Sequence, residues 1–86
     1  MKEEMEKAVG RFHKALGVLK IDYDKESGRL SEPLIMIAYE SKRSITIERV
    51  LIFNNFFLVI NDQENDVRKV YHDKVQGFRA PSQMFD

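Results

Sequence analysis

Few residues in this chain of 86 residues could carry out acid–base or metal chemistry. Cysteine is absent, which excludes a thiol nucleophile and a thiolate metal site. The two histidines, His13 and His72, belong to no ligand-spaced cluster. His72 and Asp73 could form an oriented base, but no Ser or Thr nucleophile in a strand-to-helix turn accompanies them. We therefore predict no catalytic residue, no metal ion and no cofactor, and interpret His72 as a strand-end histidine.

Carboxylates and glycines also lack the spacing of known ligand loops. Asp22 and Asp24 alternate along one segment and could offer oxygen atoms to a hard cation, but no EF-hand or comparable ligand-rich loop surrounds them. We interpret both as part of a solvated face. The motifs GxxxxGK[ST] and GxGxxG are missing, so nucleotide-dependent catalysis has no support.

Positive charge is concentrated around two predicted hairpins. The first carries Lys42, Arg43 and Arg49, and the second carries Arg68, Lys69 and Lys74 with Tyr71 interleaved. Neighbouring cationic and aromatic residues can bind nucleic acid through phosphate contacts and base stacking. The competing interpretation is that an antiparallel strand needs a polar outer face, and the sequence leaves this alternative open.

Arg68 is the residue that we predict to anchor an anionic ligand, because its planar fork of donors suits carboxylate or phosphate. Alternation places Arg68 on the opposite face of its strand from Val67, Lys69 and Tyr71. Lys74 would lie nearby, and Tyr71 or Phe57 would supply a stacking surface if the strand end twists. The predicted ligand-binding residues are therefore Arg68, Tyr71, Lys74 and Phe57.

An ordinary surface ion pair could occupy Arg68 instead. Asp66 and Asp73 are both close in sequence, and such a pair contributes under about 1 kcal/mol. Binding of an anion by wild type would distinguish the two interpretations.

Residues that could bind a ligand must be positioned by a small fold of the α+β class. Apolar residues from Met5 to Leu19 recur at spacings of three and four, which predicts an amphipathic helix over 2–16 that ends in a left-handed cap at Gly17. Gly10 marks either a close approach to the sheet or simple tolerance.

After Gly17 the hydrophobic pattern becomes that of strands joined by tight turns. The predicted strands lie at 18–23, 30–40, 45–53, 56–60 and from 67 to either 71 or 72, and residues 73–78 could form a turn followed by a short closing strand. Pro33 indicates an edge position or a strand start, and Asn54-Asn55 predicts a two-residue hairpin with left-handed residues. The apolar run 56–60 predicts a central strand buried on both faces. We expect one core that contains Phe12 and Leu16 of the helix with Phe53, Phe56, Leu58 and Ile60 of the sheet.

Five or six such strands in meander order predict a strongly bent antiparallel sheet or small barrel of the SH3 or Sm type. We expect one domain over residues 1–79, with the sheet at 18–79, and a C-terminal tail at 80–86. Apolar residues are 43% and charged residues 33% of the chain, which is typical of a folded domain. Fourteen Lys and Arg balance fourteen Asp and Glu, so any binding of nucleic acid must be local.

The second half of the chain also resembles a known family. Phe56, Phe57 and Leu58 match an aromatic-aromatic-leucine strand, Arg68 matches a strand arginine, and 73–75 match the ending Asp-Arg-Ile. These features are characteristic of the WYL domain of bacterial regulators, and residues 19–78 resemble that domain.

Upstream, either residues 21–23 with the Glu-Pro step at 32–33, or in a second register residues 37–39, resemble the family's opening strand. The resemblance implies an Sm-like barrel that senses a ligand or nucleic acid, usually attached to a helix-turn-helix. A stand-alone copy would act as an oligomer, as a partner-binding protein, or as a small bacterial or phage regulator.

The predicted function is therefore a non-enzymatic regulatory module that binds a ligand or nucleic acid. The alternative is a structural or protein-interaction protein that forms a homo-oligomer, for which a homodimer is expected. A small hydrolase is a third and weaker interpretation because no nucleophile, base and orienting residue can be assembled. The chain has no apolar run of membrane-spanning length and no cysteine, so we expect a cytoplasmic protein without membrane contact.

Overall fold

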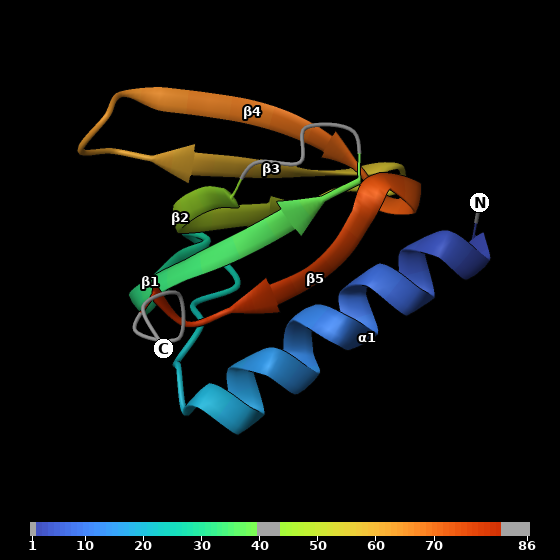
Figure 1. The fold of residues 1–86 in the computed structure, drawn as a ribbon, viewed down its shortest axis with the longest axis horizontal. Helices are drawn as coiled ribbons and strands as arrows, with labels where there is room; N and C mark the ends of the chain where they lie inside the picture. The colour runs from blue at the N-terminus through green and yellow to red at the C-terminus, as the bar shows by residue number, and fades with distance from the viewer. Residues whose placement is uncertain (1, 40–43, 82–86) are drawn as a thin grey trace.

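The computed structural model describes residues 2–39 and 44–81. One N-terminal helix is followed by a five-stranded antiparallel sheet, which confirms the predicted α+β class (Figure 1). Of the polar run 41–44, which we expected to separate two strands, residues 41–43 lie outside the described residues and Ser44 begins a strand. Residues 82–86 of the expected tail also lie outside the described residues.

Helix α1 spans Lys2–Leu19 and packs its apolar stripe against the sheet. Ala8, Phe12 and Leu16 are buried, as their spacing predicted. The helix ends three residues later than expected, because Lys20 and not Gly17 takes the left-handed conformation, with φ 58°. Ile21 N then donates to Leu16 O at 2.9 Å, which closes the helix end as in a Schellman motif.

One further expectation for the N-terminal third is wrong, and one alternative that the sequence left open is decided. Val18 and Leu19 belong to the helix, and the predicted strand at 18–23 is reduced to an isolated bridge between Tyr23 and Leu30. A Cβ atom at Gly10 would meet nothing within 4 Å, so this glycine marks no close approach to the sheet. The turn that follows does need its glycine, because Gly28 has φ 78° and lies against the backbone of Val50.

The five strands are β1 (Arg29–Ala38), β2 (Ser44–Ile52), β3 (Phe56–Asn61), β4 (Asp66–Tyr71) and β5 (Val75–Arg79). Their order in the sheet is β4-β3-β2-β1-β5, and each pair of neighbours is antiparallel. A short 3₁₀ helix, η1 (His72–Lys74), joins the two edge strands β4 and β5. The sheet is not closed, so a barrel is not confirmed.

Pro33 lies in an inner strand, not at the edge of the sheet. The pairing of β1 with β2 shifts register between Arg29 and Leu34, and β5 pairs with β1 only from Ile35 onward. The irregular stretch around Pro33 accommodates a residue that cannot donate to the ladder.

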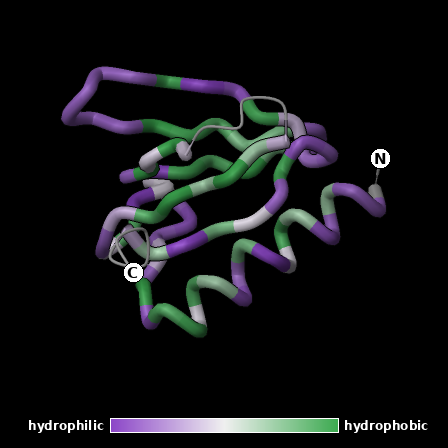
Figure 2. Tube along the Cα trace, viewed as in Figure 1, coloured by the Kyte–Doolittle hydropathy of each residue, from purple (hydrophilic) through white to green (hydrophobic). Residues whose placement is uncertain are grey.

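The core lies between the helix and the face of the sheet that carries Phe57. Hydrophobic residues concentrate in the inner strands, while the tip of the β3–β4 hairpin is hydrophilic (Figure 2). Phe57 and Val59 are 0% and 2% exposed, and the ring centroids of Phe12 and Phe57 lie 5.9 Å apart. We call this side of the sheet the inner face.

The predicted register of β3 is therefore wrong by one residue. Phe56 and Leu58 lie on the opposite, outer face and are half-buried, and Phe53 is 44% exposed. Ile60 is buried, but alternation places it on the outer face as well. Strand β3 is an inner strand flanked by β2 and β4, but the middle strand of the sheet is β2, and only the inner face of β3 belongs to the core.

Candidate ligand-binding surface on strands β3 and β4

Three aromatic rings meet on the outer face, near the end of β2, the start of β3 and the end of β4. The rings of Phe53 and Phe56 are stacked, with centroids 5.0 Å apart and an interplanar angle of 23°. Tyr71, the pairing partner of Phe56 on β4, meets the Phe56 ring edge-on at 6.0 Å. We call Phe53, Phe56 and Tyr71 the aromatic platform. Phe53 and Tyr71 are 44% and 49% exposed, so ring surface is open to solvent.

A cation lies over this platform. The Nζ atom of Lys69 is 4.6 Å from the centroid of the Phe56 ring and 5.9 Å from that of Tyr71. Cation–π attraction at such distances orients the ammonium group over the rings. The surface can therefore present a flat apolar face and a positive charge to the same ligand.

The hairpin between β2 and β3 sets the platform. Asn54-Asn55 forms the predicted two-residue turn, and Phe53 N donates to Phe56 O at 2.9 Å. Neither asparagine has a positive φ, however, so the left-handed turn that we expected is not formed. His72 contacts this turn at two points, because its Nε2 lies 2.7 Å from Phe53 O and its backbone N–H donates to Asn55 O.

His72 is consequently a structural residue in this arrangement. Its side chain is buried, and its ring meets the Phe57 ring at 4.7 Å. A carbonyl oxygen only accepts, so Nε2 carries the proton and Nδ1 is the bare nitrogen, which has no hydrogen-bond partner. His13 is exposed on the helix, and no group of three potential metal ligands occurs within residues 2–39 and 44–81.

Three of the four predicted ligand-binding residues line one pocket at the edge of the sheet, which we call the β4 pocket. Arg68, Tyr71 and Lys74 border this cavity of about 180 Å³. The remaining lining residues are Lys69, Val70, Ala38 and Ile45. Arg68 pairs with Val59 and therefore lies on the inner-face side of β4, whereas Lys69 and Tyr71 pair with Leu58 and Phe56 and lie on the outer face. The β4 pocket and the aromatic platform are thus on opposite sides of this edge strand.

Arg68 has the partner that the competing interpretation named. Its Nε donates to Asp66 Oδ2 at 2.8 Å, and the two side chains are 49% and 35% exposed. An ion pair this accessible contributes little to stability. The guanidinium retains donors beyond Nε, so the pair leaves part of the fork for another acceptor.

Phe57 is not part of the surface, which corrects its predicted role. It pairs with Ile52 and Val70 on the inner face and is 0% exposed, so no ligand can reach its ring. Sequence reasoning missed Phe53 and Phe56 because it assigned both to the core. The available signal was the hairpin itself, since a turn at 54–55 places these two rings opposite one another.

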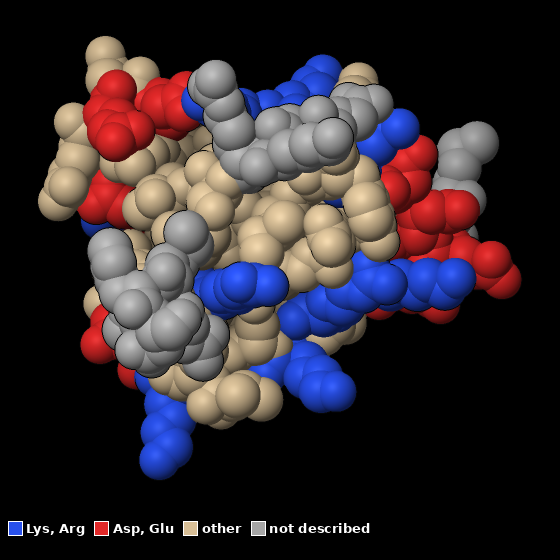
Figure 3. Space-filling model, in the orientation of Figure 1, with Lys and Arg blue, Asp and Glu red and all other residues tan. Residues whose placement is uncertain are grey.

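Charged side chains divide the molecular surface into regions. In the view of Figure 3, acidic residues gather at the start of α1 and at the β3–β4 turn, whereas basic residues follow β4 and the helix. The Arg49 guanidinium makes a two-point ion pair with Asp62 at the β3–β4 turn, at 2.8 and 3.0 Å. The chain as a whole has zero net charge, so the positive charge along β4 is a local feature.

The chain matches no protein-family model, and comparisons with curated proteins and with solved structures found no match. Within the part of the chain that the structure describes, no helix combines the length and the apolar character needed to cross a membrane.

Proposed function

We propose that this protein is a non-enzymatic binding module that holds single-stranded nucleic acid on the outer face of β3 and β4. The observation that carries the proposal is the aromatic platform with Lys69 positioned over two of its rings. Bases can stack on exposed rings whatever their sequence, and each stacked base contributes about 1 to 3 kcal/mol.

The β4 pocket, on the other side of the strand, would hold the sugar-phosphate backbone. Arg68, Lys69 and Lys74 all line it, which places positive charge along this edge strand. Charge-assisted hydrogen bonds from an arginine fork suit phosphate oxygens. Because β4 is an edge strand, a nucleic-acid strand could stack a base on the outer face and pass over the edge to place a phosphate at Arg68.

The resemblance to WYL domains supports the same proposal. A helix followed by a five-stranded antiparallel sheet is compatible with an Sm-like domain, and the matched arginine, Arg68, lines the pocket. In a closed barrel β4 would pair with β5, and η1 already joins these two edge strands. A regulatory role would follow if binding on β4 altered this junction.

Titration with a fluorescein-labelled oligothymidine of about ten nucleotides at low salt tests the proposal, with anisotropy as the readout. Phe56→Leu and Tyr71→Leu keep apolar bulk but remove a ring, and each should weaken binding by about fivefold to a hundredfold. Lys69→Gln should lower the slope of log affinity against log salt by about 0.7. Lys25→Gln, on the exposed turn after α1, is the matched control and should change nothing.

Two results would count against nucleic-acid binding. One is the absence of any anisotropy change for wild type, and the other is binding that Phe56→Leu, Tyr71→Leu and Lys69→Gln all retain. Either would favour the second candidate, a homo-oligomer, for which the unpaired outer edge of β4 and its 59% exposed Val67 are the relevant features. Sedimentation over a wide concentration range would then show a mass that falls on dilution.

A further inference from the structure

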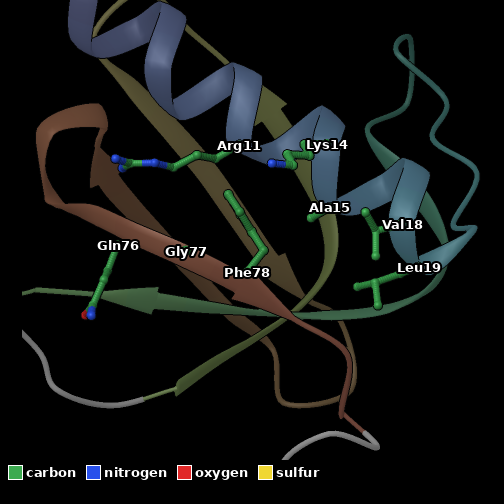
Figure 4. Close-up of a pocket in the computed structure, with 8 residues that line it drawn as sticks. All are labelled: Arg11, Lys14, Ala15, Val18, Leu19, Gln76, Gly77 and Phe78. Atoms are coloured by element: carbon green, nitrogen blue, oxygen red, sulfur yellow. The ribbon is translucent and has the colours of Figure 1, made fainter.

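A groove between α1 and β5 has the features of a separate ligand site. It has a volume of about 330 Å³, close to the lower limit of ligand pockets in general. Figure 4 shows that the helix forms one wall and the strand the other. It shares no lining residue with the β4 pocket.

Two cations stand at one side of this groove. Arg11 and Lys14 are three residues apart on α1, and both side chains extend from the helix toward β5 (Figure 4). Arg11 Nη1 donates to Val75 O at 3.1 Å, which uses one of its five donors. Among the described residues, those that line the groove include no carboxylate, and neither cation takes part in an ion pair.

The other side of the groove is apolar. Ala15, Val18 and Leu19 of the helix face Phe78 of β5, and Val18 is 70% exposed. A Cβ atom at Gly77 would meet nothing within 4 Å, so the strand side of the groove is open there. Val18 and its half-buried neighbours present apolar surface to water. An apolar ligand that covered this surface would gain free energy from its burial.

We propose that this groove binds a small amphiphilic carboxylate of the fatty-acid type. The carboxylate would accept hydrogen bonds from Arg11 and Lys14, and the hydrocarbon chain would lie on Ala15, Val18, Leu19 and Phe78. The two cations favour an anionic head group, and the apolar side of the groove favours a hydrocarbon chain.

The same contacts argue against two other occupants. A nucleobase needs a flat exposed ring, but Phe78 is held by Phe12 and Phe57, with ring centroids 5.5 and 6.2 Å apart, and is half-buried. A peptide strand added to the edge of β5 would have to share Val75 O with the Arg11 guanidinium, which already donates to it. A flexible hydrocarbon chain requires neither a free ring nor a free backbone acceptor.

Decanoate, well below the concentration at which it forms micelles, is the probe. Calorimetry should detect binding to wild type, and amide shifts in ¹H–¹⁵N spectra should cluster at Ala15, Val18 and Gly77. Shortening the chain to octanoate should weaken binding by about fourfold for each buried methylene lost. Decanol, which lacks the carboxylate, should bind more weakly than decanoate.

Variants of exposed residues locate the site without threatening the fold. Val18→Asp should weaken binding by about tenfold or more, and Lys14→Gln by about fivefold. Val67→Asp introduces the same carboxylate at a 59% exposed position on β4 and should leave decanoate binding unchanged. Circular dichroism checks that each variant is folded.

Several results would overturn the proposal. They are no heat and no shifts with wild type, equal affinity for decanol, full affinity in Val18→Asp and Lys14→Gln, or binding only to micelles or anionic vesicles. Because the oligothymidine is predicted to contact different residues, it should not displace decanoate. If binding at one site is not observed, the proposal for the other site can therefore still be tested.

Discussion

The Nε2 atom of His72 lies 2.7 Å from the carbonyl oxygen of Phe53, and this contact fixes the end of β4 to the β2–β3 turn. The backbone N–H of His72 donates to Asn55 O in the same turn, at 3.1 Å. One buried residue therefore connects the two segments that carry Phe53, Phe56 and Tyr71. The aromatic platform depends on a residue that no ligand would touch.

Replacing His72 by phenylalanine should lower the free energy of unfolding by about 1 to 3 kcal/mol, because Phe53 O loses a buried donor while ring volume is kept. Urea denaturation measures the loss. His72→Gln retains an amide donor and should recover part of it. If His72→Phe were as stable as wild type, the hydrogen bond would contribute nothing to the fold.

Gly28→Ala should be among the most destabilising small substitutions in the chain. Gly28 has φ 78°, and a Cβ atom there would lie 2.5 Å from Val50 O. We expect a loss of about 2 to 4 kcal/mol from backbone strain and overpacking. Gly10→Ala is the control, because its Cβ would meet open space inside a helix, and it should stabilise by about 1 kcal/mol. Equal melting temperatures for the two variants would contradict this account.

Tyr23 should make the protein less stable at alkaline pH. Burial, and next the nearby Asp24 carboxylate, raise the pKa of the Tyr23 hydroxyl above its ordinary value of 10.0. The folded state therefore holds the proton more tightly than the unfolded state, and stability falls as pH rises from about 10 through the folded pKa. The same hydroxyl donates to Val50 O at 2.9 Å. Denaturation midpoints measured between neutral pH and pH about 11 should show this loss in wild type, and Tyr23→Phe should show a smaller one.

Phe56 and Phe57 provide a direct test of the β3 register. Phe57→Ala should remove about 3 to 5 kcal/mol, since its fully buried ring leaves a cavity. Phe56→Ala, on the half-buried outer face, should remove about 1 kcal/mol and abolish stacking of a ligand. By the same reasoning Leu58→Ala should fall below the 2 to 5 kcal/mol range for a fully buried leucine. Hydrogen exchange should show the backbone of β3 strongly protected in wild type.

The helix could be predicted from the sequence because its buried apolar residues recur at the spacing of an α-helix. Ala8, Phe12 and Leu16 repeat every four residues, and all three are buried. The end of the helix could not be predicted, because Lys20 adopts a conformation that usually favours glycine, and Gly17 was the obvious candidate.

The register of β3 illustrates the same limit. Residues 56–60 are all apolar and carry no alternation, so the sequence does not indicate which residues face the helix. The pairing with β2 and β4 and the packing of Phe57 against Phe12 fix it in the folded protein. The cationic and aromatic residues of β4 were identified because they are polar or exposed by type, whereas Phe53 and Phe56 look like core residues in sequence. Phe57, which we predicted to contact a ligand, is buried, and its neighbour Phe56 carries the outward-facing ring.

Arg68 supplies the last prediction, because its ion pair and its proposed ligand compete for the same guanidinium. Asp66 Oδ2 accepts from Arg68 Nε at 2.8 Å, at a position where both side chains are partly exposed. Arg68→Ala should therefore leave the melting temperature nearly unchanged but weaken binding of the oligothymidine and reduce its salt dependence. Arg68→Lys keeps the charge without the fork and should recover only part of the affinity.

Asp66→Asn separates the ligand hypothesis from a purely structural ion pair. If a phosphate binds Arg68, removing the competing carboxylate should tighten binding by about twofold to fivefold, because the pair that must be broken is worth under about 1 kcal/mol. If the ion pair is the whole role of Arg68, wild type binds no oligonucleotide and Asp66→Asn binds none either. Amide shifts around Arg68 and Lys74 during the titration report which of these holds, and their absence in both proteins would remove Arg68 from the proposed site.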